Sequence, residues 1–212
     1  MTRGPDSGAT DGGAPGALLA IVSGPSGVGK DTVIEALRRR PAAAGYHYVV
    51  TCTTRPRRPY EVDGVHYHFL DQAGFQELRG SGGLLEANEV HGHWYGTPRD
   101  EVKTALRQGL DVILKIDVQG AAVVKQKVPE ALLVFIVPPS LEDLFGRLQA
   151  RATETADELD VRQRDAALEL ARQSDFDHVV TNATGQVERT AKRIDAIIRA
   201  EKAAHPDRRT RV

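Results

Sequence analysis

Residues 18–30, LLAIVSGPSGVGK, form the stretch that decides the fold. The mainly apolar run at 18–23 ends at a glycine-rich loop and predicts a short buried strand. The loop itself, 24–30, matches the P-loop pattern G-x-x-x-x-G-K, and helical character follows over 31–40. Glycines there let backbone N–H groups turn inward around phosphate oxygens, and Lys30 can reach the β and γ phosphates. The stretch therefore predicts a binding site for a nucleoside triphosphate.

Strand-like and helix-like segments alternate beyond this unit. Apolar runs predict three more core strands, at 111–116, 131–137 and 178–181. Helices are expected at 97–108, 140–151, 157–173 and 187–204. Strands that alternate with helices of this length favour right-handed crossovers and a parallel sheet covered on both faces. We therefore expect an α/β fold with three layers.

Composition and charge narrow the class of protein and its partners. The chain has 212 residues, of which 28 are Lys or Arg and 29 are Asp or Glu, so its net charge of -1 argues against nucleic-acid or membrane partners. Cys52 is the single cysteine, which fits a reducing compartment. No apolar run approaches the roughly 20 residues of a membrane span, and residues 1–16 lack the apolar core of a signal peptide. We expect a cytoplasmic protein, either a monomer or a homo-oligomer.

The chain divides into a core, an insertion and two ends. Residues 51–98 break the strand–helix alternation with short strands and several glycines, and are expected to form an inserted lobe between core segments 17–50 and 99–204. Residues 1–16 carry too little apolar surface to pack and are expected to be disordered. The end of the chain, 205–212, is expected to be a flexible tail.

Three arginines crowd together within the segment TTRPRRPYEVDGVHY at 53–67. Arg55, Arg57 and Arg58 would repel one another unless an anion or an acidic partner joins them. The arginine fork suits a phosphate bidentately. From these residues alone, a phosphate site and a solvated basic loop are about equally good interpretations.

Together with other stretches, this segment resembles guanylate kinases. The resemblance covers residues 18–202 and rests on several ordered motifs: GPSGVGK, TTRPRRPYEVDGVHY, LLEANEVHGHWYGT, ILKIDVQG, the arginines between 147 and 162, and the strand before Asn182. It implies an ATP- and Mg²⁺-dependent transfer of phosphate to GMP that yields ADP and GDP. It also implies a P-loop fold in which residues 51–98 are the GMP-binding lobe and residues 147–164 form a helical lid.

The resemblance assigns residues to the acceptor side by position. Arg55, Arg58 and Tyr67 match the residues that hold the 5′-phosphate of GMP, and Glu86 matches the carboxylate that reads guanine. Thr51 and Thr97 match hydroxyl positions near the base. Tyr95 matches the tyrosine of the family's Y-G-[ST] motif, and Asp117 matches the second acid of its D-I-D pattern. An ionised carboxylate accepts from both N1–H and N2–H₂ of guanine, whereas adenine presents a lone pair at N1, so such a site discriminates by about 10⁴ or more.

The donor side is assigned in the same way. The residues expected at ATP are Gly24, Pro25, Ser26, Gly27, Val28, Gly29, Lys30, Asp31, Thr32 and Asn182, the last near the adenine. Catalytic cations are expected at Lys30, Arg55, Arg147, Arg151 and Arg162, of which the last three match lid arginines. A closing lid would exclude water and deliver positive charge to the transferred phosphoryl group.

Two residues depart from the family pattern. Asp31 stands where a Ser or Thr hydroxyl is expected to face Mg²⁺, and Lys115 replaces the first acid of D-I-D. A carboxylate at position 31 would either bind Mg²⁺ directly or repel the nucleotide. We expect the two departures to lie near each other and to compensate, with Lys115 balancing the charge of Asp31.

Two other functions stay open on sequence alone. The loop version GPSGVGKD also resembles that of ribose 1,5-bisphosphate phosphokinases, which lack a full guanine-reading lobe. Some guanylate-kinase-like domains have lost catalysis and serve as binding modules. The presence of Lys30, Arg55, Arg58, Tyr67 and Glu86 favours an active guanylate kinase over both.

Overall fold

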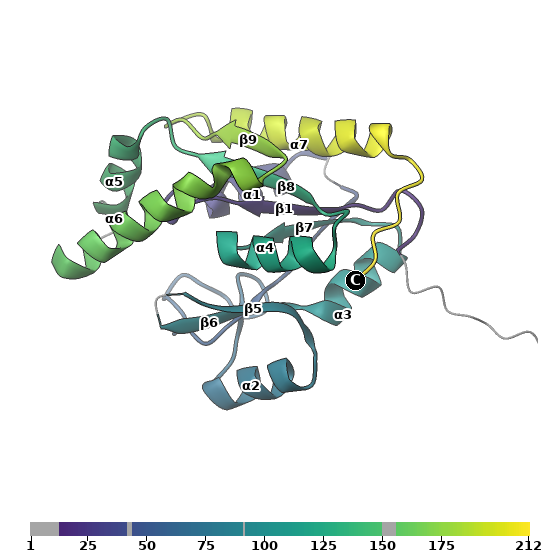
Figure 1. Ribbon diagram of the computed structural model, residues 1–212, viewed down its shortest axis with the longest axis horizontal. Coiled ribbons are helices and arrows are strands. Elements are labelled where there is room, and N and C mark those ends of the chain that lie inside the picture. Colours follow the sequence, from purple (N-terminus) through teal and green to yellow (C-terminus); the bar gives the residue numbers. More distant parts are fainter. Residues whose placement is uncertain (1–12, 42–43, 91, 150–155) are drawn as a thin grey trace, which may run out of the picture.

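A parallel sheet of five strands forms the centre of the molecule (Figure 1). The structure is a computed structural model and describes residues 13–41, 44–90, 92–149 and 156–212. The strand order is β2-β7-β1-β8-β9, and every neighbouring pair is parallel. The bounds of the strands are Tyr46–Tyr48 (β2), Asp111–Lys115 (β7), Leu19–Ser23 (β1), Leu132–Val137 (β8) and His178–Thr181 (β9). The four expected core strands are therefore confirmed, and β2 is added at an edge.

Helices cover both faces of this sheet. Side chains of β1 alternate between the faces, with Ala20 and Val22 in one apolar cluster and Leu19 and Ile21 in the other. The first cluster takes in α1 (Lys30–Arg38), α5 (Leu141–Gln149) and α7 (Val187–Ala204). The second takes in α3 (Arg99–Arg107) and α4 (Val118–Lys127). The expected three-layer α/β fold is confirmed.

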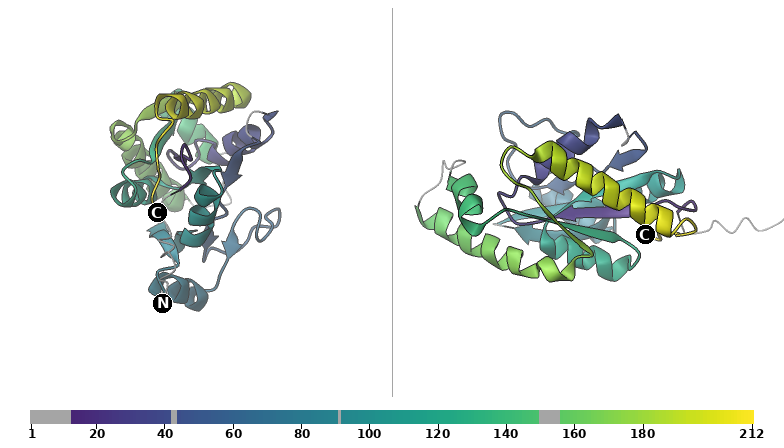
Figure 2. Two further views of the ribbon diagram at one scale, coloured as in Figure 1. Left: turned by 90° about the vertical axis from the view of Figure 1, so that its right-hand side faces the viewer. Right: turned by 90° about the horizontal axis from the view of Figure 1, so that it is seen from above.

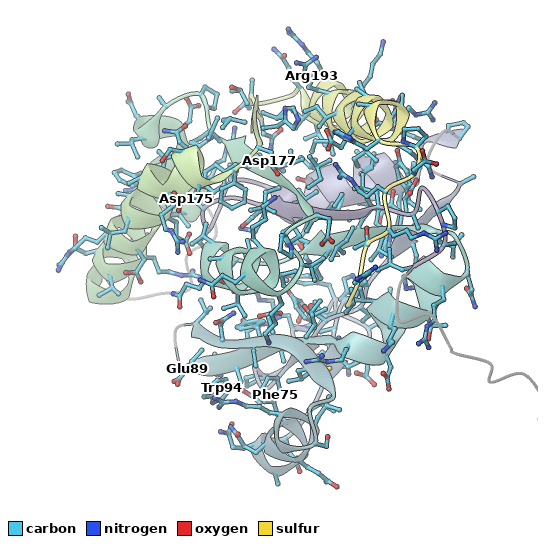
Figure 3. The ribbon with its side chains drawn as sticks, turned by 45° about the vertical axis from the view of Figure 1, so that its right-hand side comes forward. Phe75, Glu89, Trp94, Asp175, Asp177 and Arg193 are labelled. Atoms are coloured by element: carbon cyan, nitrogen blue, oxygen red, sulfur yellow. The ribbon has the colours of Figure 1, made fainter. Side chains whose placement is uncertain are left out.

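The insertion forms a second, smaller sheet that stands apart from the core layers (Figure 2). Its order is β4-β3-β6-β5, with bounds His68–Phe69, Cys52–Thr53, His93–Pro98 and Leu84–Val90. Strands β3 and β4 are parallel, whereas β3–β6 and β5–β6 are antiparallel, so the sheet is mixed. Helix α2 (Gln72–Gly80) packs on it through Phe75, whose ring lies 5.9 Å from that of Trp94 (Figure 3).

Several elements differ from the sequence-based expectation. Helices α2 and α4 were not expected, and each begins at an aspartate, Asp71 and Asp117, whose carboxylate accepts backbone N–H groups of the first turn. The helix expected at 157–173 is α6 (Ala156–Ala171), and a 3₁₀ turn, η2 (Arg172–Asp175), follows it. None of the helices in the described ranges is long and apolar enough to cross a membrane.

At the end of the chain, where a flexible tail was expected, Thr210 contacts the segment that precedes β1. The Thr210 side chain is fully buried and donates from Oγ1 to the carbonyl of Ala17 at 2.9 Å. The segment before β1 lies beside it, since the N–H of Gly13 donates to Thr210 O and that of Gly16 to Arg208 O. Mutual pairing of the two ends satisfies backbone groups that neither end satisfies alone. Residues 1–12, most of the segment expected to be disordered, lie outside the described ranges.

Candidate active site: a cleft between the P-loop and the inserted lobe

The loop between β1 and α1 has the shape of a phosphate cradle. Gly24 has φ 148°, and a Cβ there would lie 2.4 Å from the carbonyl oxygen of Ile136. Gly29 precedes α1 with φ 95°, and a Cβ there would lie 2.8 Å from Nδ2 of Asn182. Both positions therefore require glycine. No side-chain hydrogen bond caps the start of α1, and the first N–H groups of a helix have no partner within the helix itself.

Lys30 is folded back onto this loop. Its Nζ donates to the carbonyl oxygens of Gly24 at 2.5 Å and Pro25 at 3.1 Å. Burial lowers the pKa of the Lys30 ammonium, while nearby carboxylates, Glu169 first among them, oppose that change. In this arrangement the loop's own carbonyls accept from two of the three N–H donors of the ammonium.

Arg147 and Asn182 brace the loop from behind. Arg147 donates to the carbonyl oxygens of Val28 at 3.1 Å and Asn182 at 2.9 Å, and Nδ2 of the buried Asn182 donates to the same Val28 oxygen at 2.8 Å. The structure thus places the expected catalytic Arg147 on the backbone of the P-loop, and it is not among the residues that line the cleft. Arg151 lies outside the described residues.

A cleft of about 190 Å³ separates the loop from the inserted lobe. The structure brings together there eleven of the residues expected from sequence: Ser26, Lys30, Asp31, Thr51, Arg55, Arg58, Tyr67, Glu86, Tyr95, Asp117 and Arg162. Lys115 and Glu169 join them. A larger hollow of about 610 Å³ adjoins the cleft and shares part of its lining, including Asp31 and Lys115. The donor and acceptor residues therefore face one space.

Glu61 holds the arginines of the lobe together. Its buried carboxylate accepts from the Arg55 guanidinium at 2.7 Å and from the Arg58 N–H at 2.8 Å. Burial opposes ionisation, but these hydrogen bonds keep the pKa of Glu61 below its usual value. The Arg55 guanidinium also lies 5.6 Å from the ring centre of Tyr67. Glu61 is the acidic partner that the crowded arginines required, and it lies within their own sequence motif.

Glu86 lines the cleft, and its carboxylate accepts hydrogen bonds from two side chains. Thr97 donates from Oγ1 to one carboxylate oxygen at 2.6 Å, and Asn88 donates from Nδ2 to the other at 2.7 Å. The antiparallel pairing of β5 with β6 places Glu86 opposite Thr97. Burial raises the pKa of Glu86 to about 7, against the effect of these two hydrogen bonds. Sequence reasoning missed Asn88, although it lies two residues along the strand and so on the same face.

The two departures from the family pattern contact each other. Lys115 ends β7 next to β1, whose loop leads to Asp31, and the Lys115 Nζ lies 2.5 Å from the Asp31 carboxylate. The same ammonium lies 5.0 Å from the ring centre of Tyr67. Although burial opposes it, Tyr67 and Asp31 hold the pKa of Lys115 above its ordinary value. The ion pair is therefore part of the cleft wall, between the donor loop and the acceptor lobe.

Asp117 and Glu169 act on backbone groups. The Asp117 carboxylate begins α4 by accepting from the N–H groups of Gln119 at 2.8 Å and Gly120 at 3.0 Å. The Glu169 carboxylate, from α6, accepts from the N–H of Ser26 at 2.8 Å. Sequence reasoning missed Glu169 because its position among the acids of α6 gives no signal of a partner in the P-loop.

A parallel sheet with a P-loop after its central strand, joined by one cleft to an arginine-rich lobe, defines a kinase that transfers phosphate between two bound substrates. The particular family follows from comparison with known proteins. The family model described as guanylate kinase matches residues 17–201, and the chain belongs to this family.

Curated relatives and a solved structure agree with this assignment. The chain is 47% identical over 184 residues to a guanylate kinase of Mycobacterium bovis, covering 85% of this chain and 88% of the relative. It is 44% identical to that of Lactococcus lactis, covering 87% and 88%. The crystal structure of guanylate kinase from Anaplasma phagocytophilum superimposes with a TM-score of 0.72 at 30% identity, covering 90% of this chain and 88% of that chain.

The contact between Asp31 and Lys115 leads to a prediction about coupling. Asp31→Ser leaves the Lys115 ammonium without its carboxylate, and Lys115→Asp places a second carboxylate beside Asp31. Each single change is expected to lower kcat/KM, and the double variant is expected to recover part of the loss, with a coupling of about 0.5–3 kcal/mol. Steady-state kinetics across a Mg²⁺ titration is measured for the wild type, the two single variants and the double variant.

The exposed ion pair of Arg172 with Asp175, at 3.1 Å, lines neither the cleft nor the larger hollow and serves as a control. Its double-mutant cycle is expected to leave kcat/KM unchanged. If the effects of Asp31→Ser and Lys115→Asp simply add, the two departures do not compensate.

Proposed function

We propose that the cleft divides phosphoryl transfer from ATP to GMP between a donor half on the P-loop and an acceptor half on the inserted lobe. This guanylate kinase catalyses ATP + GMP = ADP + GDP. The observation that carries the division is the shared lining of one cleft by Ser26 and Lys30 on one side and by Arg55, Arg58 and Glu86 on the other.

The donor half would receive the ATP phosphates on the N–H groups of the loop and on the start of α1. Lys30 would exchange the carbonyls of Gly24 and Pro25 for phosphate oxygens, which are stronger partners for an ammonium. Arg162 lies in the cleft and would add charge to the transferred group. Arg147 would act indirectly, by holding the loop carbonyl of Val28. The movement of the expected lid, 147–164, stays a prediction, as does the role of Arg151.

Mg²⁺ fits the chemistry of the residue at the start of α1. Mg²⁺ in kinases is typically held by one or two protein oxygens together with phosphate oxygens and water. The Asp31 side chain lines the cleft and is 69% exposed, so its carboxylate could exchange partners for a metal ion there. Bound there, the ion would neutralise charge on the donor phosphates. The Thr32 hydroxyl instead donates to Gly29 O at 2.8 Å and so belongs to the loop's own structure.

The acceptor half would bind GMP at two points. Arg55, oriented by Glu61, would hold the 5′-phosphate together with Arg58 and the Tyr67 hydroxyl. Glu86 would accept from N1–H and N2–H₂ of guanine at the other end, with Thr51, Tyr95 and Thr97 around the base. Transfer would be in line between the two phosphates, with positioning and charge neutralisation supplying the rate enhancement.

We also place the enzyme in the cytoplasm. Support comes from Cys52, the single cysteine of the chain, which is buried and not paired in a disulfide.

The acceptor specificity tests the function directly. A coupled ADP-release assay with GMP, AMP and ribose 1,5-bisphosphate as acceptors is expected to show turnover with GMP, and about 10⁴-fold lower kcat/KM with AMP, because adenine presents an acceptor to Glu86. Preferred turnover of ribose 1,5-bisphosphate would assign the chain to a different reaction. If none of the three acceptors supports ADP release, the result would indicate a binding module.

The raised pKa of Glu86 predicts a pH dependence of GMP use. Guanine requires the ionised carboxylate, and its fraction falls as pH drops below about 7. We expect kcat/KM for GMP to fall roughly fivefold from pH 7 to pH 6 and to level off above pH 8.

Glu86→Gln is the matched control for that titration. It cannot ionise, so its kcat/KM for GMP is expected to be low at every pH and to retain only the pH dependence of the substrate phosphate. Its discrimination against AMP is expected to relax, because the amide presents both a donor and an acceptor. An identical pH profile in the two proteins would remove Glu86 from the recognition of guanine.

A further inference from the structure

A carboxylate from α6 occupies the backbone of the phosphate-binding loop. The N–H of Ser26 donates to Oε2 of Glu169 at 2.8 Å, across 143 residues of sequence. Arg162 lies seven residues earlier on the same helix, two turns away, and also lines the cleft. Helix α6 therefore presents a cation and an anion to the same space.

The amide that Glu169 engages lies at the end of the donor site nearest the acceptor. Among residues 24–29, all of which the structure describes, Ser26 is the one that lines the cleft shared with Arg55 and Arg58. The phosphoryl group in transit has to pass through that shared space. The Ser26 N–H is thus placed to meet the terminal phosphate of the donor.

A carboxylate and a phosphate make the same kind of contact with a backbone N–H. Both are acceptors that carry negative charge, and inward-facing N–H groups of such loops bind anions generally. Glu169 is also the strongest of the charges that favour the ammonium form of Lys30 in its buried position. The Glu169 carboxylate therefore lies at the part of the loop where a phosphate of the bound nucleotide is expected.

We propose that Glu169 is a placeholder for the terminal phosphate of ATP. Its carboxylate binds the Ser26 amide when no nucleotide is present and is displaced when ATP binds. The inference rests on the proposed role of the P-loop as the ATP site. Displacement releases α6 from the loop, so the helix that carries Arg162 responds to the presence of the third phosphate. ADP lacks that phosphate and leaves the contact between Glu169 and Ser26 in place.

The exchange has a consequence for nucleotide selectivity. Two anions cannot share one N–H at contact distance, so the carboxylate opposes triphosphate binding more than diphosphate binding. Glu169→Gln keeps the shape of the side chain and removes its charge. It is expected to increase affinity for a non-hydrolysable ATP analogue by about fivefold or more, a typical size for coupling between competing groups, with a smaller change for ADP.

Isothermal titration calorimetry in the absence of GMP measures the ratio of the affinities for the triphosphate and the diphosphate. Wild type, Glu169→Gln, Glu169→Ala and Asp165→Asn are each titrated with adenylyl imidodiphosphate and with ADP, both with Mg²⁺ and with EDTA. Asp165→Asn makes the same charge change one turn away on α6, and Asp165 is not among the residues that line the cleft. The triphosphate-to-diphosphate affinity ratio is expected to rise in both Glu169 variants and to stay at the wild-type value in Asp165→Asn.

The outcomes separate the inference from the function on which it rests. Equal weakening of both nucleotides in the Glu169 variants would show that the carboxylate only shapes the loop, which overturns the placeholder. An unchanged ratio, or the same rise in Asp165→Asn, overturns it as well. Failure of the wild-type protein to bind either nucleotide would instead overturn the proposed role of the P-loop itself.

Discussion

Positive charge held at close quarters is the constraint on which the rest of this site depends. One cleft of about 190 Å³ is lined by Lys30, Arg55, Arg58, Lys115 and Arg162, which suits two phosphate-bearing substrates but costs free energy in their absence. The structure supplies internal partners for at least three of these cations. Glu61 accepts from Arg55, Asp31 pairs with Lys115, and the Lys30 ammonium donates to carbonyls of its own loop. The cations are thereby kept in place before either nucleotide binds.

These partners differ in how readily a substrate could replace them. Glu61 is 5% exposed and is surrounded by the loop that it organises, so its role is to hold Arg55 at the wall of the cleft. The Asp31 side chain is largely exposed, and Glu169 reaches the P-loop from a separate element, helix α6. A substrate phosphate or a metal ion could therefore replace the present partners of either carboxylate. The fold makes this arrangement possible because parallel strands end at the same edge of the sheet, which brings Lys115 of β7 beside the loop that follows β1.

Sequence alone could predict the features that depend on local patterns. The P-loop, the four core strands and the place of Glu86 in the cleft each belong to a short stretch of sequence with a recognisable pattern. The contact between Asp31 and Lys115 could also be predicted, because both residues depart from recognisable motifs at neighbouring strand ends. Long-range contacts of residues outside any motif could not be predicted in this way, which is why Glu169 and the burial of Thr210 were missed. The contacts of Arg147 with backbone carbonyls could not be predicted either, because a motif position does not show whether a side chain faces the cleft or the backbone behind it.

The division of the cleft is tested most directly by Lys30→Ala, with the exposed Lys192→Ala as control. GMP affinity from calorimetry and turnover from ADP release are measured on the same preparations. If Lys30 serves the donor half alone, as proposed, kcat falls by a factor of about 10² or more while the Kd for GMP stays within about twofold of wild type. Lys192→Ala is expected to change neither. A loss of GMP affinity that parallels the loss of turnover would contradict two separate halves.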